Sequence, residues 1–238
     1  MIREQGHVNY GRHSFEFTVL RRKRTTLEIG VETDGTVTVV APIGATLEAI
    51  SEKVRKRASW VRQQQHFFLQ FVPRTPSRRY VPGETHLYLG RQYRLKVTEG
   101  NTSMVKLWRG FLIVQSKNPK RADVTREILN SWYLDRARVK FAERLEICLS
   151  RFRSPENFRP KGLIIRQLHR RWGSMSAGRR MVLNRGLIQA PVDSIDYVIT
   201  HELCHVAQPH HEPAFFRLLD RILPNWERRK QRLECVLA

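Results

Sequence analysis

The alternation of apolar and polar residues in the first half of the chain predicts mainly strands. Residues 27–42 read as two strands that turn at Asp34 and Gly35, a pair typical of tight hairpins. Two further hairpins are predicted at residues 85–100 and 105–116, turning near Gly90 and Gly110. We therefore expect a β-rich region before residue 120.

Other segments repeat their apolar residues every three or four positions, which predicts helices. The first covers residues 46–72 and ends before Pro73, and the second covers residues 122–149. A proline-containing linker, residues 73–83, follows the first helix.

In the last third of the chain, residues 163–168 and 180–186 are predicted to be paired strands around the turn "GSMSAG", and the remainder is predicted to be helical. This order of elements predicts an α+β fold. A boundary near residue 120 would separate a β-rich accessory domain, 1–120, from a second domain, 121–238.

Charge is the outstanding property of the composition, because 43 Lys and Arg residues outnumber 22 Asp and Glu residues and give a net charge of +21. A chain this basic favours polyanionic partners such as nucleic acid or nucleotides, although a solvated basic surface is the simpler interpretation.

Two features bear on the compartment. No run of about 18 apolar residues predicts a membrane span, and the first residues lack the apolar core of a secretory signal. The three cysteines are scattered and odd in number, which argues against a disulfide framework. We expect a cytoplasmic protein with no membrane partner.

The strongest chemical signal is H-E-x-x-H at His201, Glu202 and His205, within "YVITHELCHVAQPHHEPAFF". Pro191 suits the first turn of a helix that must end before Pro209. The two histidines would then lie one turn apart on one face and could grip a single ion. Apolar flanks imply that this helix is buried, so its polar side chains need partners.

A third ligand is expected from the turn that follows the helix. We favour His211 over its neighbour His210, because one more residue gives the turn more reach. Acidic alternatives that stay open are Glu212, Glu227 and Glu234.

Three imidazoles favour Zn²⁺ and leave one coordination position for water. Glu202 would take a proton from that water, which would attack a carbonyl, and would return the proton to the leaving amine. The expected activity is that of a zinc-dependent hydrolase, most plausibly a peptidase acting on peptide or protein.

Residues 163–233 resemble the YgjP-like metallopeptidases, which are zincin-type proteins, and are more distantly similar to SprT-like proteases that act on proteins crosslinked to DNA. The resemblance is carried by the H-E-L-x-H motif and by Trp172–Ser174, Leu183–Asn184, Leu187, Ala190–Pro191, Asp196–Val198, His211, Ala214–Phe215 and Pro224. It implies a zincin-like core, made of a β-hairpin and the H-E-x-x-H helix, with His201, His205 and His211 as ligands and Glu202 as general base. One departure is Met175, where the family commonly has Cys.

Four of the residues that precede the predicted H-E-x-x-H helix are candidates for binding substrate. Trp172, Gly173 and Ser174 could form an edge to which an extended peptide adds as a strand, or a tight turn with a core tryptophan. Asn184 could brace the metal helix or a histidine, or could simply end a strand.

A basic strip precedes the motif, since residues 157–192 hold eight arginines and lysines and no Asp or Glu. The candidates for contact with a polyanion are Arg166, Arg170, Arg171, Arg179, Arg180 and Arg185. Two rival functions follow: a metal-dependent hydrolase of nucleoside triphosphates, and a non-enzymatic nucleic-acid-binding protein with structural zinc.

Overall fold

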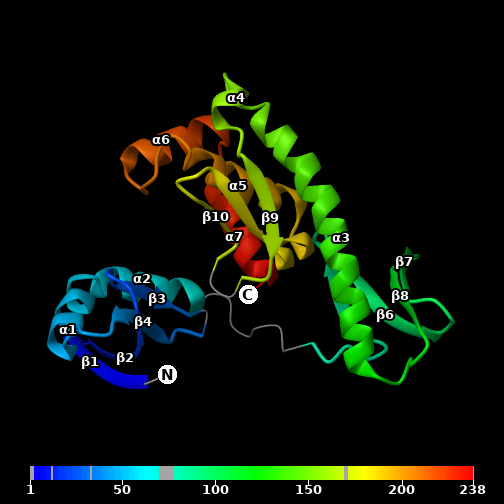
Figure 1. Ribbon diagram of the computed structural model, residues 1–238, viewed down its shortest axis with the longest axis horizontal. Coiled ribbons are helices and arrows are strands. Elements are labelled where there is room, and N and C mark those ends of the chain that lie inside the picture. Colours follow the sequence, from blue (N-terminus) through cyan, green and yellow to red (C-terminus); the bar gives the residue numbers. More distant parts are fainter. Residues whose placement is uncertain (1–2, 12, 33, 70–77, 169–170, 238) are drawn as a thin grey trace. The chain divides into compact units, whose positions relative to one another are not determined.

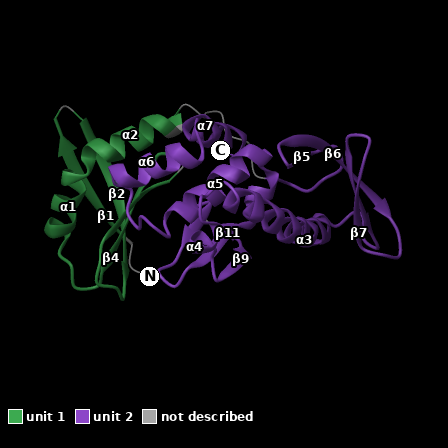
Figure 2. Cartoon of the chain, turned by 90° about the horizontal axis from the view of Figure 1, so that it is seen from above, with its two compact units in different colours: residues 1–74, 238 green, residues 75–237 purple. Residues whose placement is uncertain are grey.

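The chain is a mixture of short sheets and helices, which confirms the α+β prediction (Figure 1). The computed structural model describes every residue except 1–2, 12, 33, 70–77, 169–170 and 238. Two compact units divide it, residues 1–74 with 238 and residues 75–237 (Figure 2). None of the helices formed by the described residues is both long and apolar enough to cross a membrane.

Unit 1 is a four-stranded sheet, in the order β1-β2-β4-β3, with two helices. Its elements are β1 Arg3–Tyr10, β2 His13–Arg22, β3 Glu28–Val31, β4 Val37–Pro42, α1 Leu47–Lys56 and α2 Ala58–Leu69. The strands β3 and β4 are antiparallel, which confirms the hairpin predicted at residues 27–42. The core joins Phe17 and Val39 of the sheet to Ile50 and Val54 of α1.

The single helix predicted over residues 46–72 is two helices that meet at Arg57. Arg57 has φ −103° and ψ 7°, which takes it out of helical geometry. The break places Val54, Ala58 and Val61 in the same core. Because the segment contains no Gly or Pro, its local pattern gives no sign of this break.

Unit 2 opens with a four-stranded sheet in the order β5-β6-β8-β7. Its strands are β5 Thr85–Tyr88, β6 Arg91–Glu99, β7 Met104–Trp108 and β8 Phe111–Ser116. Both hairpins are antiparallel, as predicted, and turn at Gly90 and Gly110, which have φ of +77° and +82°. A positive φ is the conformation that favours glycine at such turns.

The long helix α3, Ala122–Leu149, occupies the residues that the sequence predicts. Its buried residues Leu129 and Tyr133 share one core with Leu112 and Val114 of the sheet. At 28 residues it is about 42 Å long. Figure 1 shows it running from the β6-β8 sheet to the short helix α4, Pro155–Phe158.

A third sheet, in the order β10-β11-β9, precedes the histidine motif. It consists of β9 Gly162–Arg166, β10 Gly173–Met175 and β11 Arg180–Asn184. The predicted strands at 163–168 and 180–186 do pair, but they are parallel. The hairpin around "GSMSAG" is formed by β10 and β11 instead, because only β10 is close enough in sequence to turn back on β11. This leaves β10 as an edge strand.

The remaining elements are helical, as predicted. They are the 3₁₀ helix η1 Arg185–Gln189, α5 Val192–Cys204, α6 Pro213–Ile222 and α7 Trp226–Leu237. Ile195, Ile199 and Leu203 place α5 in the core of unit 2.

The division between units lies at residue 74, whereas the sequence pattern placed a domain boundary near residue 120. The sheet β5–β8 belongs to unit 2 because Leu112 and Val114 pack in the same core as α3. The β5–β6 turn also reaches the start of α5. Leu89 and Gly90 donate their backbone N–H groups to the carbonyls of Ile188 and Gln189, at 3.0 and 2.9 Å.

Candidate metal centre

Helix α5 begins beside Pro191 and ends before Pro209, as the sequence predicts. Pro191 is the N-cap residue, and the helix runs from Val192 to Cys204, with His205 at its C-cap. His201 therefore lies in the last turn of the helix. His205 is the residue directly after the helix and lies one turn beyond His201 on the same face.

The turn after α5 brings the chain back over these two histidines. Its backbone is held by the N–H of Gln208, which donates to Cys204 O at 3.0 Å. In return, Nδ1 of His205 donates to the carbonyl of Gln208 at 3.0 Å. This hydrogen bond fixes the ring of His205 and leaves its Nε2 with a free lone pair, which is the form that binds a metal.

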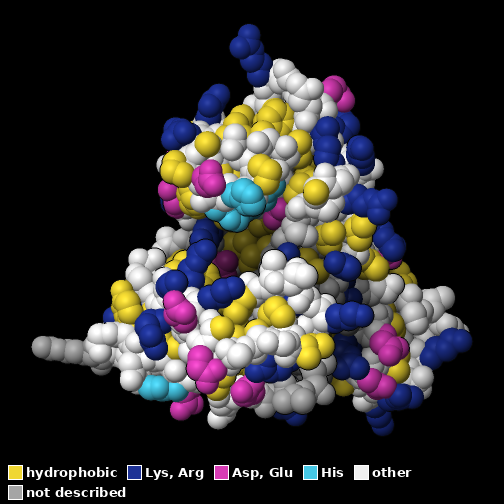
Figure 3. All heavy atoms as spheres, turned by 60° about the vertical axis from the view of Figure 1, so that its left-hand side comes forward, with side chains coloured by type: hydrophobic (Ala, Val, Ile, Leu, Met, Phe, Trp, Pro, Cys, Tyr) yellow, Lys and Arg dark blue, Asp and Glu magenta, His cyan; other side chains and the backbone are white. Residues whose placement is uncertain are grey.

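The three histidines converge. One ring nitrogen each of His201, His205 and His211 lies within 4.8 Å of the others, and the Nε2 atoms of His201 and His211 are 2.9 Å apart. Ligands on one tetrahedral zinc at 2.0–2.1 Å are about 3.3 Å apart, so the spacing fits a zinc ion after a small adjustment. Figure 3 shows histidine side chains gathered at the surface beside hydrophobic side chains.

The other candidates for the third ligand do not join this group. Among the residues that the structure describes, the cluster holds neither His210 nor Glu212, Glu227 or Glu234. Glu212 instead lies at the N-cap of α6. The geometry thus favours His211.

Phe215 of α6 forms an apolar floor beneath the histidines. Its ring centre lies 4.9 Å from that of His201 and 4.7 Å from those of His205 and His211, and its side chain is fully buried. Sequence reasoning gave Phe215 no role in the site. The signal was its position four residues after His211, one turn into a helix that starts at Pro213.

The side chain of Glu202 is buried and lies against Gly173 of β10. Burial raises the pKa of Glu202 to about 7, and the backbone N–H of Met175 and the charge of Arg171 offset this effect only in part. Its Oε2 is buried and has no hydrogen-bond partner among the described residues. An unsatisfied carboxylate oxygen of this kind is typical of a site that takes a water or a ligand.

The histidines themselves favour the neutral, metal-binding form. Burial lowers the pKa of His201 to about 3, helped by the nearby rings of His205 and His211. Burial also lowers the pKa of His211. Neutral imidazoles need no proton loss before they coordinate a metal.

The predicted substrate residues lie on or behind β10. Gly173 and Ser174 are on the edge strand, next to α5, while Trp172 packs against the core of unit 2. The amide of Asn184 donates to the carbonyls of Leu168 and Arg171, at 2.8 and 3.1 Å. Asn184 therefore braces the segment before β10, and its direct contact with a substrate stays a prediction.

The arginines of the basic strip have different surroundings. Arg166, Arg171 and Arg180 are exposed, whereas Arg185 is half-buried and donates to the side-chain oxygen of Gln167 at 3.2 Å. Arg179 donates to the carbonyls of Asn157 and Arg159, at 2.7 and 2.8 Å, so its guanidinium holds the loop instead of facing solvent. Arg170 lies outside the described residues.

Comparison with known proteins identifies the family of the chain. No curated protein matches the chain. A sequence model of the family described as "YgjP-like, metallopeptidase domain" matches residues 25–235. The match begins well before residue 163, where the recognisable motifs start, and so includes most of unit 1. The chain therefore belongs to the YgjP-like metallopeptidase domain family.

Proposed function

We propose that this protein is a zinc-dependent peptidase whose metal is held by His201, His205 and His211 and whose general base is Glu202. The observation that carries the proposal is the convergence of three imidazole nitrogens beside a buried carboxylate with an unpartnered oxygen. Membership of a metallopeptidase family supports the same assignment.

The donor set suits zinc, because three neutral imidazoles in a partly apolar niche bind this ion well. When bound, zinc acts as a Lewis acid that polarises the scissile carbonyl and lowers the pKa of water nearby. The hydrogen bond from His205 to Gln208 and the floor provided by Phe215 hold two of the rings in position before any ion arrives.

Glu202 does the proton transfers. Its carboxylate can take a proton from the attacking water and, once protonated, can give it to the amine nitrogen that leaves, and burial, which raises its pKa, favours its protonation. The N–H of Met175 orients the carboxyl group while leaving Oε2 without a partner among the described residues.

The edge strand β10 would bind the substrate. It packs on α5 and has one side paired with β11, so its other side offers backbone hydrogen-bonding groups next to Glu202. An extended peptide could add there as a strand. Gly173 and Ser174 would then contact the substrate backbone, and exposed Arg171 would lie close enough to favour acidic groups.

The decisive experiment compares three variants of the full chain. Glu202→Gln should abolish cleavage of an unfolded protein while leaving bound zinc unchanged, because Gln keeps the shape but cannot carry the proton. His211→Ala should lose zinc, whereas His210→Ala should retain it. Full activity of Glu202→Gln would refute the peptidase proposal.

The same assays address the alternatives. Release of phosphate from nucleoside triphosphates, lost in Glu202→Gln, without any peptide cleavage, would point to a phosphoanhydride hydrolase. Zinc retained with neither activity would favour a structural metal.

A further inference from the structure

The sheet β5–β8 has one face in the core and one face in solvent. Leu95, Leu112 and Val114 point inward to the core that includes α3, so their neighbours along each strand point outward. The strand pairings align the outward residues in rows across the sheet. One row is Arg94, Phe111 and Trp108, and the next is Lys96, Ile113 and Lys106.

This outward face is aromatic and apolar to an unusual degree for a solvated surface. Trp108 is 52% exposed, Met104 49% and Phe111 39%. All three lie on the adjacent strands β7 and β8, and Trp108 is the direct cross-strand partner of Phe111. Two such rings side by side on a sheet offer flat surfaces that no described element of unit 2 covers.

All the charged side chains on this outward face are cationic. Arg94, Lys96 and Lys106 point outward from the strands, and Arg109 lies in the turn between Trp108 and Phe111. No outward position of the four strands holds Asp or Glu, since the single acidic residue in them, Glu99, is at the opposite parity along β6. Within the described residues, no ion pair occupies these four cations.

The cations lie close to the indole. Lys106 Nζ is 5.0 Å from the centre of the Trp108 ring, and the guanidinium carbon of Arg109 is 5.3 Å from it. An exposed cation–π contact is weaker than the stacking of a base on an aromatic ring, so a base can displace these side chains. The displaced cations would remain within reach of the flanking phosphates.

The turn makes this arrangement rigid. Arg109 and Gly110 both have positive φ, +43° and +82°, which is the geometry of a two-residue hairpin turn matched to strand twist. The carbonyl of Gly110 accepts a hydrogen bond from the N–H of Arg94 at 2.9 Å. The aromatic pair is therefore fixed to the third strand, and binding would cost little ordering of the backbone.

We propose that the outward face of β6, β7 and β8 binds single-stranded nucleic acid, with bases stacked on Trp108 and Phe111 and phosphates held by Arg94, Lys96, Lys106 and Arg109. A single strand fits better than a duplex, whose bases are already stacked and cannot lie on a ring. A bilayer fits less well, because three exposed apolar side chains are too few to insert. The net charge of +21 favours a polyanion in general.

This surface is separate from the metal centre. The sheet packs on the first half of α3, around Leu129 and Tyr133, while α5 is joined to the second half through Arg144 and to the turn after α3 through Arg151. Variants on the outward face should therefore leave bound zinc unchanged, which keeps this proposal distinguishable from that of the peptidase.

The test measures binding of the full chain to a fluorescein-labelled 15-nucleotide oligothymidine by anisotropy. Trp108→Ala and Phe111→Ala should each weaken binding about fivefold or more, as expected for loss of one stacked base. Trp108→Phe should restore most of the affinity. Trp60→Ala, which removes an exposed tryptophan of α2, is the matched control and should bind like the parent protein.

Salt dependence provides the second measurement, and it does not rely on removing an aromatic ring. The double variant Lys106→Gln and Arg109→Gln should make the slope of log Kd against log salt shallower by about 1.4. Equal affinity for single strands and duplex, with Trp108→Ala unaffected, would overturn the proposal. So would binding to phosphatidylserine vesicles that Trp108→Ala abolishes while the oligonucleotide is not bound.

Discussion

Gly173 of the edge strand β10 lies directly against Glu202 of α5. A Cβ atom at position 173 would be 2.8 Å from Oε1 of Glu202 and 2.9 Å from its Cγ. The backbone of Gly173 is ordinary extended strand, so its lack of a side chain serves this contact and not an unusual conformation. The niche that holds the proposed general base therefore exists only while residue 173 is glycine.

Gly173→Ala should displace Glu202 without unfolding the protein. A carboxylate moved by a few tenths of an ångström or more would lose its alignment, and we expect peptide cleavage to fall about 10- to 100-fold. Zinc content should not change. Gly178→Ala, in the same hairpin, is the control, because its nearest neighbour would be Ser176 Oγ at 3.9 Å. Equal losses in both variants would contradict this explanation.

Phe215→Ala should weaken both stability and zinc binding. Removing a fully buried phenyl ring costs about 3–5 kcal/mol, and here the cavity would open under all three histidine rings. Phe216→Ala removes a neighbouring ring that is well exposed and should cost less than about 1 kcal/mol. Chemical unfolding and zinc titration measure the two effects. A zinc affinity unchanged in Phe215→Ala would show that the rings do not need this floor.

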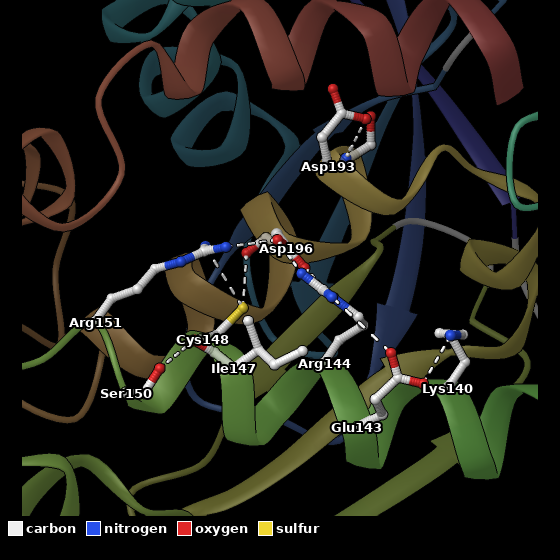
Figure 4. Close-up of polar contacts among 10 residues, drawn as sticks. Lys140, Glu143, Arg144, Ile147, Cys148, Ser150, Arg151, Asp193 and Asp196 are labelled. Carbon is white, nitrogen blue, oxygen red and sulfur yellow. Dashed lines mark hydrogen bonds and ion pairs between the residues drawn. The ribbon is translucent and has the colours of Figure 1, made fainter.

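Asp196 on α5 is held by Arg144 of α3 and by Arg151, which directly follows α3 (Figure 4). Arg144 donates to both carboxylate oxygens at 2.7 Å, and Arg151 donates to Oδ2 at 2.7 Å. Asp196→Asn should cost about 2–3 kcal/mol, less than a fully buried pair, because both arginines keep some contact with water.

The control for Asp196 lies three residues earlier on the same helix. Asp193 pairs with Arg232 at 2.9 Å in an open setting, so Asp193→Asn should cost less than about 1 kcal/mol. Urea unfolding of both variants measures the difference. Equal destabilisation of the two variants would mean that the buried ion pairs of Asp196 contribute no more to stability than the exposed pair of Asp193.

The metal-free protein should show two buried groups with opposite effects on stability. Burial lowers the pKa of His201 from 6.5 to about 3, so the folded state takes up this proton less readily and loses stability as the pH falls below 6.5. Burial raises the pKa of Glu202 from 4.5 to about 7, so the folded state gains stability as the pH falls from 7 to 4.5. Between pH 6.5 and 4.5 the two contributions nearly cancel.

Glu202→Gln should expose the histidine contribution. Relative to the parent protein, its free energy of unfolding should fall by about 2 kcal/mol between pH 6.5 and 4.5, because the gain from Glu202 is gone. Other titrating groups are common to both proteins and cancel in the comparison. Urea unfolding with a chelator at several pH values measures this. Parallel pH profiles would show that Glu202 is not held in the buried state.

Local patterns predicted the elements that depend on local chemistry. Helix α3 follows its apolar repeat over residues 122–149, and α5 starts beside Pro191 as the proline requires. The hairpin turns at Gly90 and Gly110 were visible because positive φ favours glycine. The convergence of His211 with the other two histidines also follows from spacing, helped by the resemblance to a family.

What the sequence did not reveal depends on contacts between distant segments. The parallel pairing of β9 with β11 has no local signature, because period-two alternation says nothing of direction. The need for glycine at position 173 is set by Glu202, 29 positions away, and the role of Phe215 appears only when three rings gather around it. The role of Asn184 in bracing the segment before β10 depends on its two carbonyl partners in the same way.

The seating of the β5–β6 turn against the start of α5 limits how the protein can be dissected. A Cβ at Gly90 would lie 2.9 Å from Cα of Pro191, and the hydroxyl of Tyr133 donates to Leu87 O at 2.7 Å. Truncation to residues 121–238 would remove the β5–β8 sheet with these contacts and would expose the side of α3 on which the sheet packs. The shortest fragment able to fold around the histidines should therefore begin near residue 75, so the β5–β8 sheet is a structural part of the unit that holds them.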